Sequence, residues 1–158
     1  MKDILIITSV IIGIPFFVVY FWEEKEVKFD EIELEYLSEQ IVRVKREDNT
    51  IENVFLEEYV VGVVAGEMPV LFELEALKAQ SVASRTYVLK KIQDNKNNDY
   101  DVLDTVSNQV YLDDEQLRFK WGDRYDEYVS KVRSAVNETS MEYLSYNGEI
   151  IKTKSLRG

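Results

Sequence analysis

Residues 57–87 read EEYVVGVVAGEMPVLFELEALKAQSVASRTY, and this stretch predicts two helices joined by a turn. The first part has apolar residues at helical spacing, and Glu67 is the single charged residue between positions 59 and 72. Met68 and Pro69 follow at once, and a helix does not easily continue through proline. We therefore expect the first helix to end at Glu67.

The second, longer helix is predicted from Leu74 to about Gln93, where the composition favours helix. Ala76, Ala79 and Ala83 lie along one side of it, and these alanines together with Ser81 and Ser84 leave little side-chain bulk, so another element is expected to approach closely. The other predicted elements are strands at Ile41–Lys45, Ile51–Phe55 and Val106–Leu112, a helix at Tyr125–Val136, and a hairpin at Met141–Ile151 that turns at Asn147-Gly148. These elements predict an α+β fold, with helices beside an antiparallel sheet.

The first 22 residues predict a transmembrane anchor. Residues 4–22 are nineteen consecutive uncharged, mostly apolar positions, which is about the length that a helix needs to cross a bilayer. The alternative is a cleaved signal peptide, but the run ends in WEEKE rather than in a small-residue cleavage site. We expect a retained single-pass anchor in the cell membrane, with the rest of the chain on the outer side.

Composition limits the chemistry that the chain can perform. Beyond the anchor and an acidic spacer at 23–40, the 158-residue chain has room for one modest domain. The net charge of −11 leaves no surplus of Lys and Arg to neutralise phosphates, so no nucleic-acid partner is expected. Cysteine and histidine are absent, which excludes disulfides, thiolate or imidazole metal ligands and a Ser-His-Asp triad.

Glu67 is the carboxylate best placed for acid–base chemistry. Apolar neighbours such as Val63, Val64 and Met68 are expected to raise the pKa of its carboxyl by disfavouring the charged form, which suits a proton donor near neutral pH. The alternative is a carboxylate at a helix end that pairs with a basic side chain. Composition and spacing alone leave both interpretations open.

Two segments, EEYVVGVVAGEMP at 57–69 and EALKAQSVASRTY at 75–87, resemble the hallmark of the stage II sporulation protein D family. In that family they take the forms EEYVxGVVAxEMP and EALKAQxVAxRTY. Its members are peptidoglycan lytic transglycosylases, which split the link between N-acetylmuramic acid and N-acetylglucosamine and leave a 1,6-anhydro sugar. The resemblance implies that Glu67 is the catalytic acid and base, because the C6 hydroxyl of the muramic acid supplies the nucleophile and one carboxyl is then sufficient. It implies no cofactor and no metal ligand among these residues.

The resemblance also implies supporting roles for three residues of the second helix. Arg85 occupies the arginine position of the family pattern and is expected to hold Glu67 or to bind the glycan, the alternative being a structural ion pair with another acid. Gln80 is a candidate for a hydrogen bond to a sugar, and Tyr87 for stacking against a pyranose face. For both of these residues the alternative is plain packing.

The same resemblance implies partners. The family acts during engulfment in sporulation on glycan strands that have lost their stem peptides, alongside an amidase and a membrane scaffold protein. Some relatives resemble amidase enhancers. The alternative function is therefore a non-catalytic anchored module that recruits or stimulates a cell-wall amidase.

The resemblance covers residues 41–151, which we expect to form the N-terminal part of the family's catalytic domain. Longer members continue through a serine- and glycine-rich segment into a second half, whereas residues 152–158 form a divergent basic tail. The sequence thus predicts a truncated domain, with an unpaired edge on the hairpin at Met141–Ile151. An inactive remnant is a further alternative.

Overall fold

The structure of the chain, a computed structural model, describes residues 39–105 and 108–153. Within these two ranges, no helix has both the length and the apolar character needed to span a membrane. The predicted anchor at 4–22 and nearly all of the predicted spacer at 23–40 lie outside the described residues, as does most of the basic tail.

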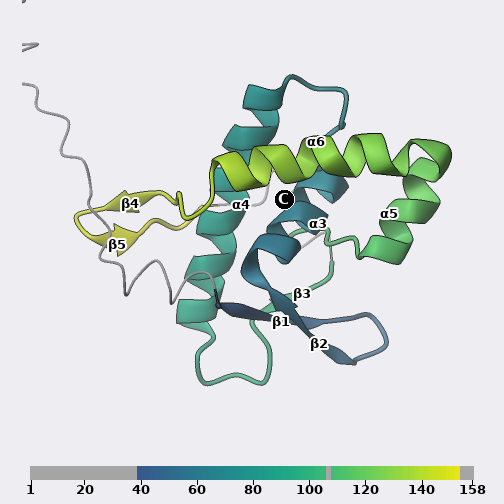
Figure 1. Cartoon of the computed structure of the whole chain (residues 1–158). Coiled ribbons are helices and arrows are strands. Elements are labelled where there is room, and N and C mark those ends of the chain that lie inside the picture. The colour runs from purple at the N-terminus through teal and green to yellow at the C-terminus, as the bar shows by residue number, and fades with distance from the viewer. Residues whose placement is uncertain (1–38, 106–107, 154–158) are drawn as a thin grey trace, which may run out of the picture. The chain divides into compact units, whose positions relative to one another are not determined.

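A three-stranded sheet forms one layer of the domain (Figure 1). Its strands, in the spatial order β2-β1-β3, are β2 (Ile51–Phe55), β1 (Ile41–Lys45) and β3 (Val102–Leu103). The first two strands form the predicted antiparallel hairpin, and β3 pairs parallel to β1. Burial alternates along β1, so Val42 and Val44 face the core.

Helices form the rest of the domain. They are α3 (Leu56–Glu67), α4 (Leu74–Asp94), α5 (Asp114–Trp121), a 3-10 turn η1 (Gly122–Arg124) and α6 (Tyr125–Glu138). Helices α3, α4 and α6 pack against one another, and α6 crosses the other two in the view of Figure 1. The predictions of α3, α4 and α6 are therefore confirmed.

Helix α5 and the short strand β3 are elements that sequence reasoning missed, and α5 carries a signal that could have revealed it. Asp113 precedes it and accepts a hydrogen bond from the backbone N–H of Gln116, whose side chain accepts one from the backbone N–H of Asp113. This is a capping box, and the spacing D-x-x-Q at 113–116 is the signal that predicts such a helix start.

The core lies between the sheet and the three packed helices. Most of its side chains are valines, which fit both the strands and the closely packed helices. Its fully buried apolar members are Val42, Val44, Leu56, Tyr59, Val60, Val63, Val64, Ala65, Leu77, Val88, Val102, Val132, Ala135 and Val136.

The buried face of α4 includes several polar side chains and none of the helix's alanines. Ala79 is exposed, and Ala76 and Ala83 are half-buried, so the alanines do not mark the packed side of α4. Ser81 and Ser84, the other small residues of this helix, are fully buried. The buried positions of α4 instead include Gln80, Ser81, Ser84, Arg85 and Thr86. Buried polar side chains need partners, and their partners define the site described below.

Two further predictions concern the C-terminal half. A strand was predicted at Val106–Leu112, and this prediction is wrong for residues 108–112, which are not part of a strand. These residues lie against α3 instead of at a sheet edge. The hairpin is confirmed as β4 (Ser145–Tyr146) and β5 (Glu149–Ile150). It turns at Asn147 and Gly148, which both have positive φ.

Candidate functional site

Glu67 is the last residue of α3, and its side chain is buried. The backbone N–H of Met68 bonds to the carbonyl of Val64 and closes the helix, and Pro69 follows. Only 8% of Glu67 is exposed, among the buried valines of the same helix. The predicted helix end is confirmed, and the acid lies in a poorly solvated position.

Gln80 on α4 is a hydrogen-bond partner of this carboxylate. Its side-chain Nε2 lies 2.9 Å from Oε2 of Glu67 and 3.1 Å from Oγ of Ser84. All three side chains are buried. The structure therefore brings together Glu67 and Gln80, two of the residues that the sequence singled out.

Arg85 has a different partner. Its guanidinium binds Glu57 through two contacts, Nε–Oε1 at 2.8 Å and Nη2–Oε2 at 2.6 Å, and it also donates to the carbonyls of Val136 and Glu142. Arg85 is fully buried at 0% exposure. Gln80 and Arg85 are five residues apart, so they project about 140° apart around α4. This is the structural ion pair that the sequence left open as the alternative.

Two tyrosines flank the acid. Tyr87 donates its hydroxyl to Oδ1 of Asn108 at 3.0 Å, and Tyr59 donates to Oε1 of Gln109 at 3.4 Å. Burial raises the pKa of both hydroxyls, and the nearby negative charge of Glu67 adds to the effect. Both tyrosines therefore remain neutral donors at physiological pH.

Sequence reasoning did not find Asn108 and Gln109. Both amides are buried, at 9% and 2% exposure. Their neighbours in the sequence predicted a strand, and nothing in their spacing connects them to residues of α3 or α4. They reach the tyrosines only because of the path that the chain takes across α3.

Two glycines of α3 make that path possible. A Cβ atom at Gly62 would lie 2.5 Å from the carbonyl oxygen of Leu112, and one at Gly66 would lie 2.5 Å from that of Val110. Such distances are far below van der Waals contact, so only glycine lets this backbone lie directly on the helix. Tyr111 stacks on Tyr59 from the same segment, with ring centroids 5.2 Å apart.

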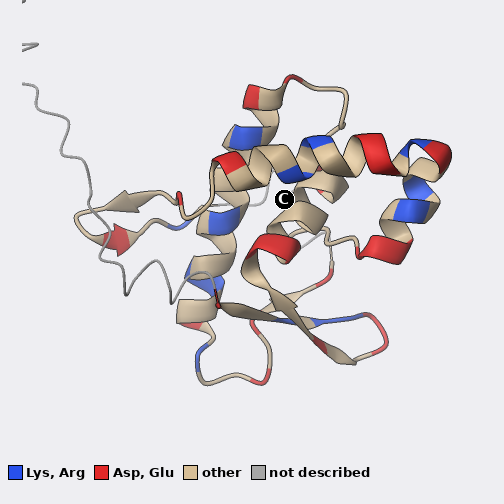
Figure 2. Ribbon diagram, viewed as in Figure 1, with Lys and Arg blue, Asp and Glu red and all other residues tan. Residues whose placement is uncertain are grey.

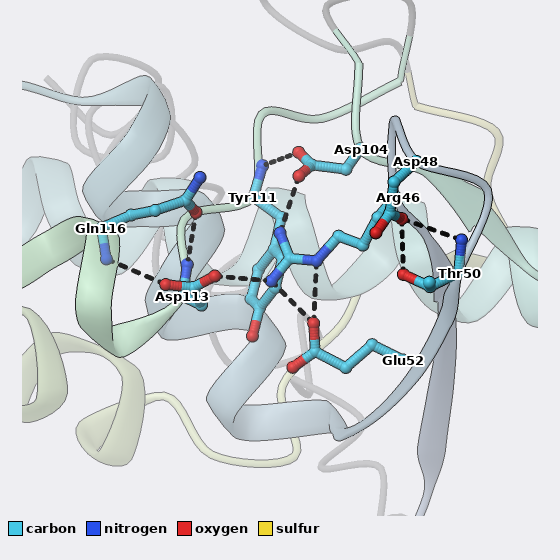
Figure 3. Close-up of polar contacts among 8 residues, drawn as sticks. All are labelled: Arg46, Asp48, Thr50, Glu52, Asp104, Tyr111, Asp113 and Gln116. Atoms are coloured by element: carbon cyan, nitrogen blue, oxygen red, sulfur yellow. Dashed lines mark hydrogen bonds and ion pairs between the residues drawn. The ribbon is translucent and has the colours of Figure 1, made fainter.

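The two ends of this segment are held by Arg46, which follows β1 (Figure 3). Its guanidinium contacts three carboxylates, on Glu52 at 2.7 Å, Asp104 at 2.7 Å and Asp113 at 2.9 Å. It also lies over the ring of Tyr111, 4.7 Å from the centroid. Asp104 and Asp113 bracket residues 105–112, so this cluster fixes both ends of the segment that carries the two buried amides.

A surface depression of about 500 Å³ lies beside the Arg46 cluster, and its lining includes Asp104, Tyr111 and Asp113 but not Glu67.

Acidic residues recur at the β1–β2 turn, on α5 and on α6 (Figure 2). In the two described ranges no group of three acidic side chains is arranged to hold a metal ion.

Comparison with known proteins places these residues in a family. The family model described as "Stage II sporulation protein" matches residues 45–146. Stage II sporulation protein D of Bacillus subtilis (strain 168) is 39% identical over 109 residues, 66% of this chain and 32% of the relative. The protein of the same name from Bacillus amyloliquefaciens is 40% identical over 109 residues, again 66% of this chain and 32% of the relative. The chain thus spans about a third of the length of these two relatives.

A relative with a different name also matches. The "Amidase enhancer" of Bacillus subtilis (strain 168) is 38% identical over 90 residues, which are 57% of this chain and 10% of the relative. The matched family region contains Glu67, Gln80, Arg85 and Tyr87, together with the segment that carries Asn108 and Gln109.

Proposed function

This chain belongs to the Stage II sporulation protein family (SpoIID), and on that premise we propose that it is a peptidoglycan lytic transglycosylase of sporulation in which Glu67 is the general acid and base. The observation that carries the proposal is the buried carboxyl of Glu67 at the end of α3, held by Gln80. Burial favours the protonated carboxyl, and a protonated carboxyl is needed to donate to a leaving oxygen.

The reaction needs one carboxyl on the enzyme. The Glu67 carboxyl gives its proton to the glycosidic oxygen while the bond from that oxygen to the anomeric carbon of the muramic acid breaks. The C6 hydroxyl of the same sugar bonds to the anomeric carbon, and its proton passes to the Glu67 carboxylate. The products are a 1,6-anhydro end and a free hydroxyl on the N-acetylglucosamine, and Glu67 is again protonated.

The proposed substrate is the glycan strand after its stem peptides have been removed, during engulfment. We place the reaction on the outer side of the cell membrane, with residues 4–22 as the single-pass anchor. The run of nineteen uncharged residues supports the anchor. An amidase that removes stem peptides and a membrane scaffold protein are the proposed partners.

The reaction class is tested with denuded glycan in water enriched in oxygen-18. Mass spectrometry of the products separates the two ways of breaking the bond, because only hydrolysis takes an oxygen atom from water. Unlabelled 1,6-anhydro ends support a lytic transglycosylase. Labelled reducing ends would show hydrolysis, which normally needs a second carboxylate.

The likeness to an amidase enhancer supports a second candidate, a non-catalytic module that recruits or stimulates a cell-wall amidase. This function requires no acid at position 67. A Glu67→Gln variant that stimulates an amidase as well as the parent chain, when neither forms anhydro product, would favour the second candidate over the first.

A further inference from the structure

We propose that Gln80, itself oriented by Ser84, is the positioning residue of Glu67 and keeps the ionised form of this buried carboxyl accessible. The inference rests on the proposed acid–base role of Glu67. Its basis is the pair of contacts from a single nitrogen, Nε2 of Gln80, to Oε2 of Glu67 at 2.9 Å and to Oγ of Ser84 at 3.1 Å.

The orientation of the Gln80 amide is fixed by these two acceptors. A side-chain amide nitrogen has two hydrogens, and here each has an acceptor on a different residue. Ser84 is one helical turn beyond Gln80, on the same face of α4, so it can hold the amide without any change in the backbone. With both residues buried, there is little water to compete for these hydrogens.

The contact changes the balance between the two forms of Glu67. Burial alone disfavours the carboxylate, and an acid that is never ionised cannot take back a proton from the C6 hydroxyl. A donor N–H stabilises the ionised form and offsets part of the cost of burial. Because the amide has no charge, it does so without holding Glu67 permanently ionised, as a bound guanidinium would.

Several charged and titratable groups lie near the Glu67 carboxyl. The tyrosine hydroxyls of Tyr59 on α3 and Tyr87 on α4 interact with the charge of Glu67, and both remain neutral. Lys120 on α5 lies close to this end of α3, where its Nζ donates to the carbonyl of Ala65 at 2.7 Å. Arg85 is bound to Glu57. Gln80 is a neutral donor that bonds directly to the carboxylate of Glu67.

The test is a carbon-13 NMR titration of the glutamate carboxyls in the full 158-residue chain, with the Glu67 signal assigned by its loss in Glu67→Gln. Gln80→Met keeps a side chain of similar length and volume but removes the donor. Gln93→Met makes the same change on the exposed end of the same helix and is the matched control. Circular dichroism first establishes that each variant has the helix content of the parent.

In Gln80→Met, Glu67 is expected to titrate at a higher pH than in the parent, and in Gln93→Met at the same pH. Ser84→Ala leaves the Gln80 side-chain amide in place but removes the hydroxyl that orients it. We expect this variant to move the titration of Glu67 in the same direction by a smaller amount. This variant serves as the test if Gln80→Met does not fold. An unchanged titration in the folded Gln80→Met variant, or in Ser84→Ala where only that variant folds, would overturn the proposal.

Turnover provides a second readout. In Gln80→Met, kcat is expected to fall about tenfold or more with KM little changed. Because Glu67 must be protonated to donate, the alkaline limb of the pH profile is expected to move to higher pH. If Glu67→Gln retains full activity, the proposed function fails whatever the titration shows. If Glu67→Gln is inactive and Gln80→Met leaves both the titration and the pH profile unchanged, only the role of Gln80 fails.

Discussion

Arg85 and Glu57 form a two-point ion pair, with Nε–Oε1 and Nη2–Oε2 distances of 2.8 and 2.6 Å. The pair joins the start of α3 to the middle of α4. Since Glu57 and Glu67 are ten residues apart on α3, the pair lies roughly 15 Å along the helix from the candidate catalytic carboxyl. Two carboxylates of α3 are thus bound by residues of α4: Glu57 by the charged guanidinium of Arg85, and Glu67 by the neutral amide of Gln80.

Arg85→Met should destabilise the fold strongly. The change leaves Glu57 without its partner and removes donors from the carbonyls of Val136 and Glu142. Because Glu57 is only partly buried, with 26% of its side chain exposed, we expect a loss of about 2 kcal/mol, below the cost of leaving a fully buried charge unpaired. Urea unfolding followed by circular dichroism measures the loss. The double variant with Glu57→Leu should recover part of it, and a cost below about 1 kcal/mol in Arg85→Met would show that the pair is not structural.

Gly66→Ala should be more damaging than its size suggests. The added Cβ would lie 2.5 Å from the carbonyl oxygen of Val110, so the backbone of residues 108–112 must move. We expect a loss of about 2 kcal/mol in the free energy of unfolding, within the range for overpacked sites. Gly148→Ala is the comparison, because it meets no atom within 4 Å and carries only the strain of its positive φ. Equal losses in the two variants would contradict the close contact.

Stability should fall at alkaline pH. Burial raises the pKa of Tyr59, Tyr87 and Tyr111 above the ordinary value of 10.0, so the folded chain keeps protons that the unfolded chain releases. Their contribution is fully present below pH 10.0 and is lost as the pH rises through the folded values. Tyrosinate absorbance and circular dichroism should therefore change together. Complete tyrosine ionisation while the helices stay intact would contradict this burial.

Part of the site could be predicted from the sequence. The apolar passage around Glu67 and the proline after it predicted a buried acid at a helix end, which the structure contains. The spacing of Gln80, Ser84 and Tyr87 by four and three residues also places them on one helical face, whereas Arg85 lies well away from it. Helical spacing thus separates Gln80 from Arg85, but it does not tell which face of α4 meets Glu67, and the expectation that Arg85 holds Glu67 depended on that missing information.

The rest depended on contacts between distant parts of the chain. Arg46 binds Asp104 and Asp113, which are 58 and 67 residues away, and no local pattern pairs one arginine with these particular acids. Asn108 reaches Tyr87 only because its segment lies on α3. The apolar residues of the Val106–Leu112 segment would also suit a strand, which is why periodicity alone predicted a strand there.

The central claim is that Glu67 is the acid and base of a lytic transglycosylase, and the most direct test compares the full chain with its Glu67→Gln variant on denuded glycan. Glu73→Gln, which changes an exposed acid in the following loop, is the matched control. The account predicts 1,6-anhydro product from the parent and from Glu73→Gln, and a loss of at least a thousandfold in Glu67→Gln at unchanged helix content. Equal yields of anhydro product from the parent and Glu67→Gln would contradict it.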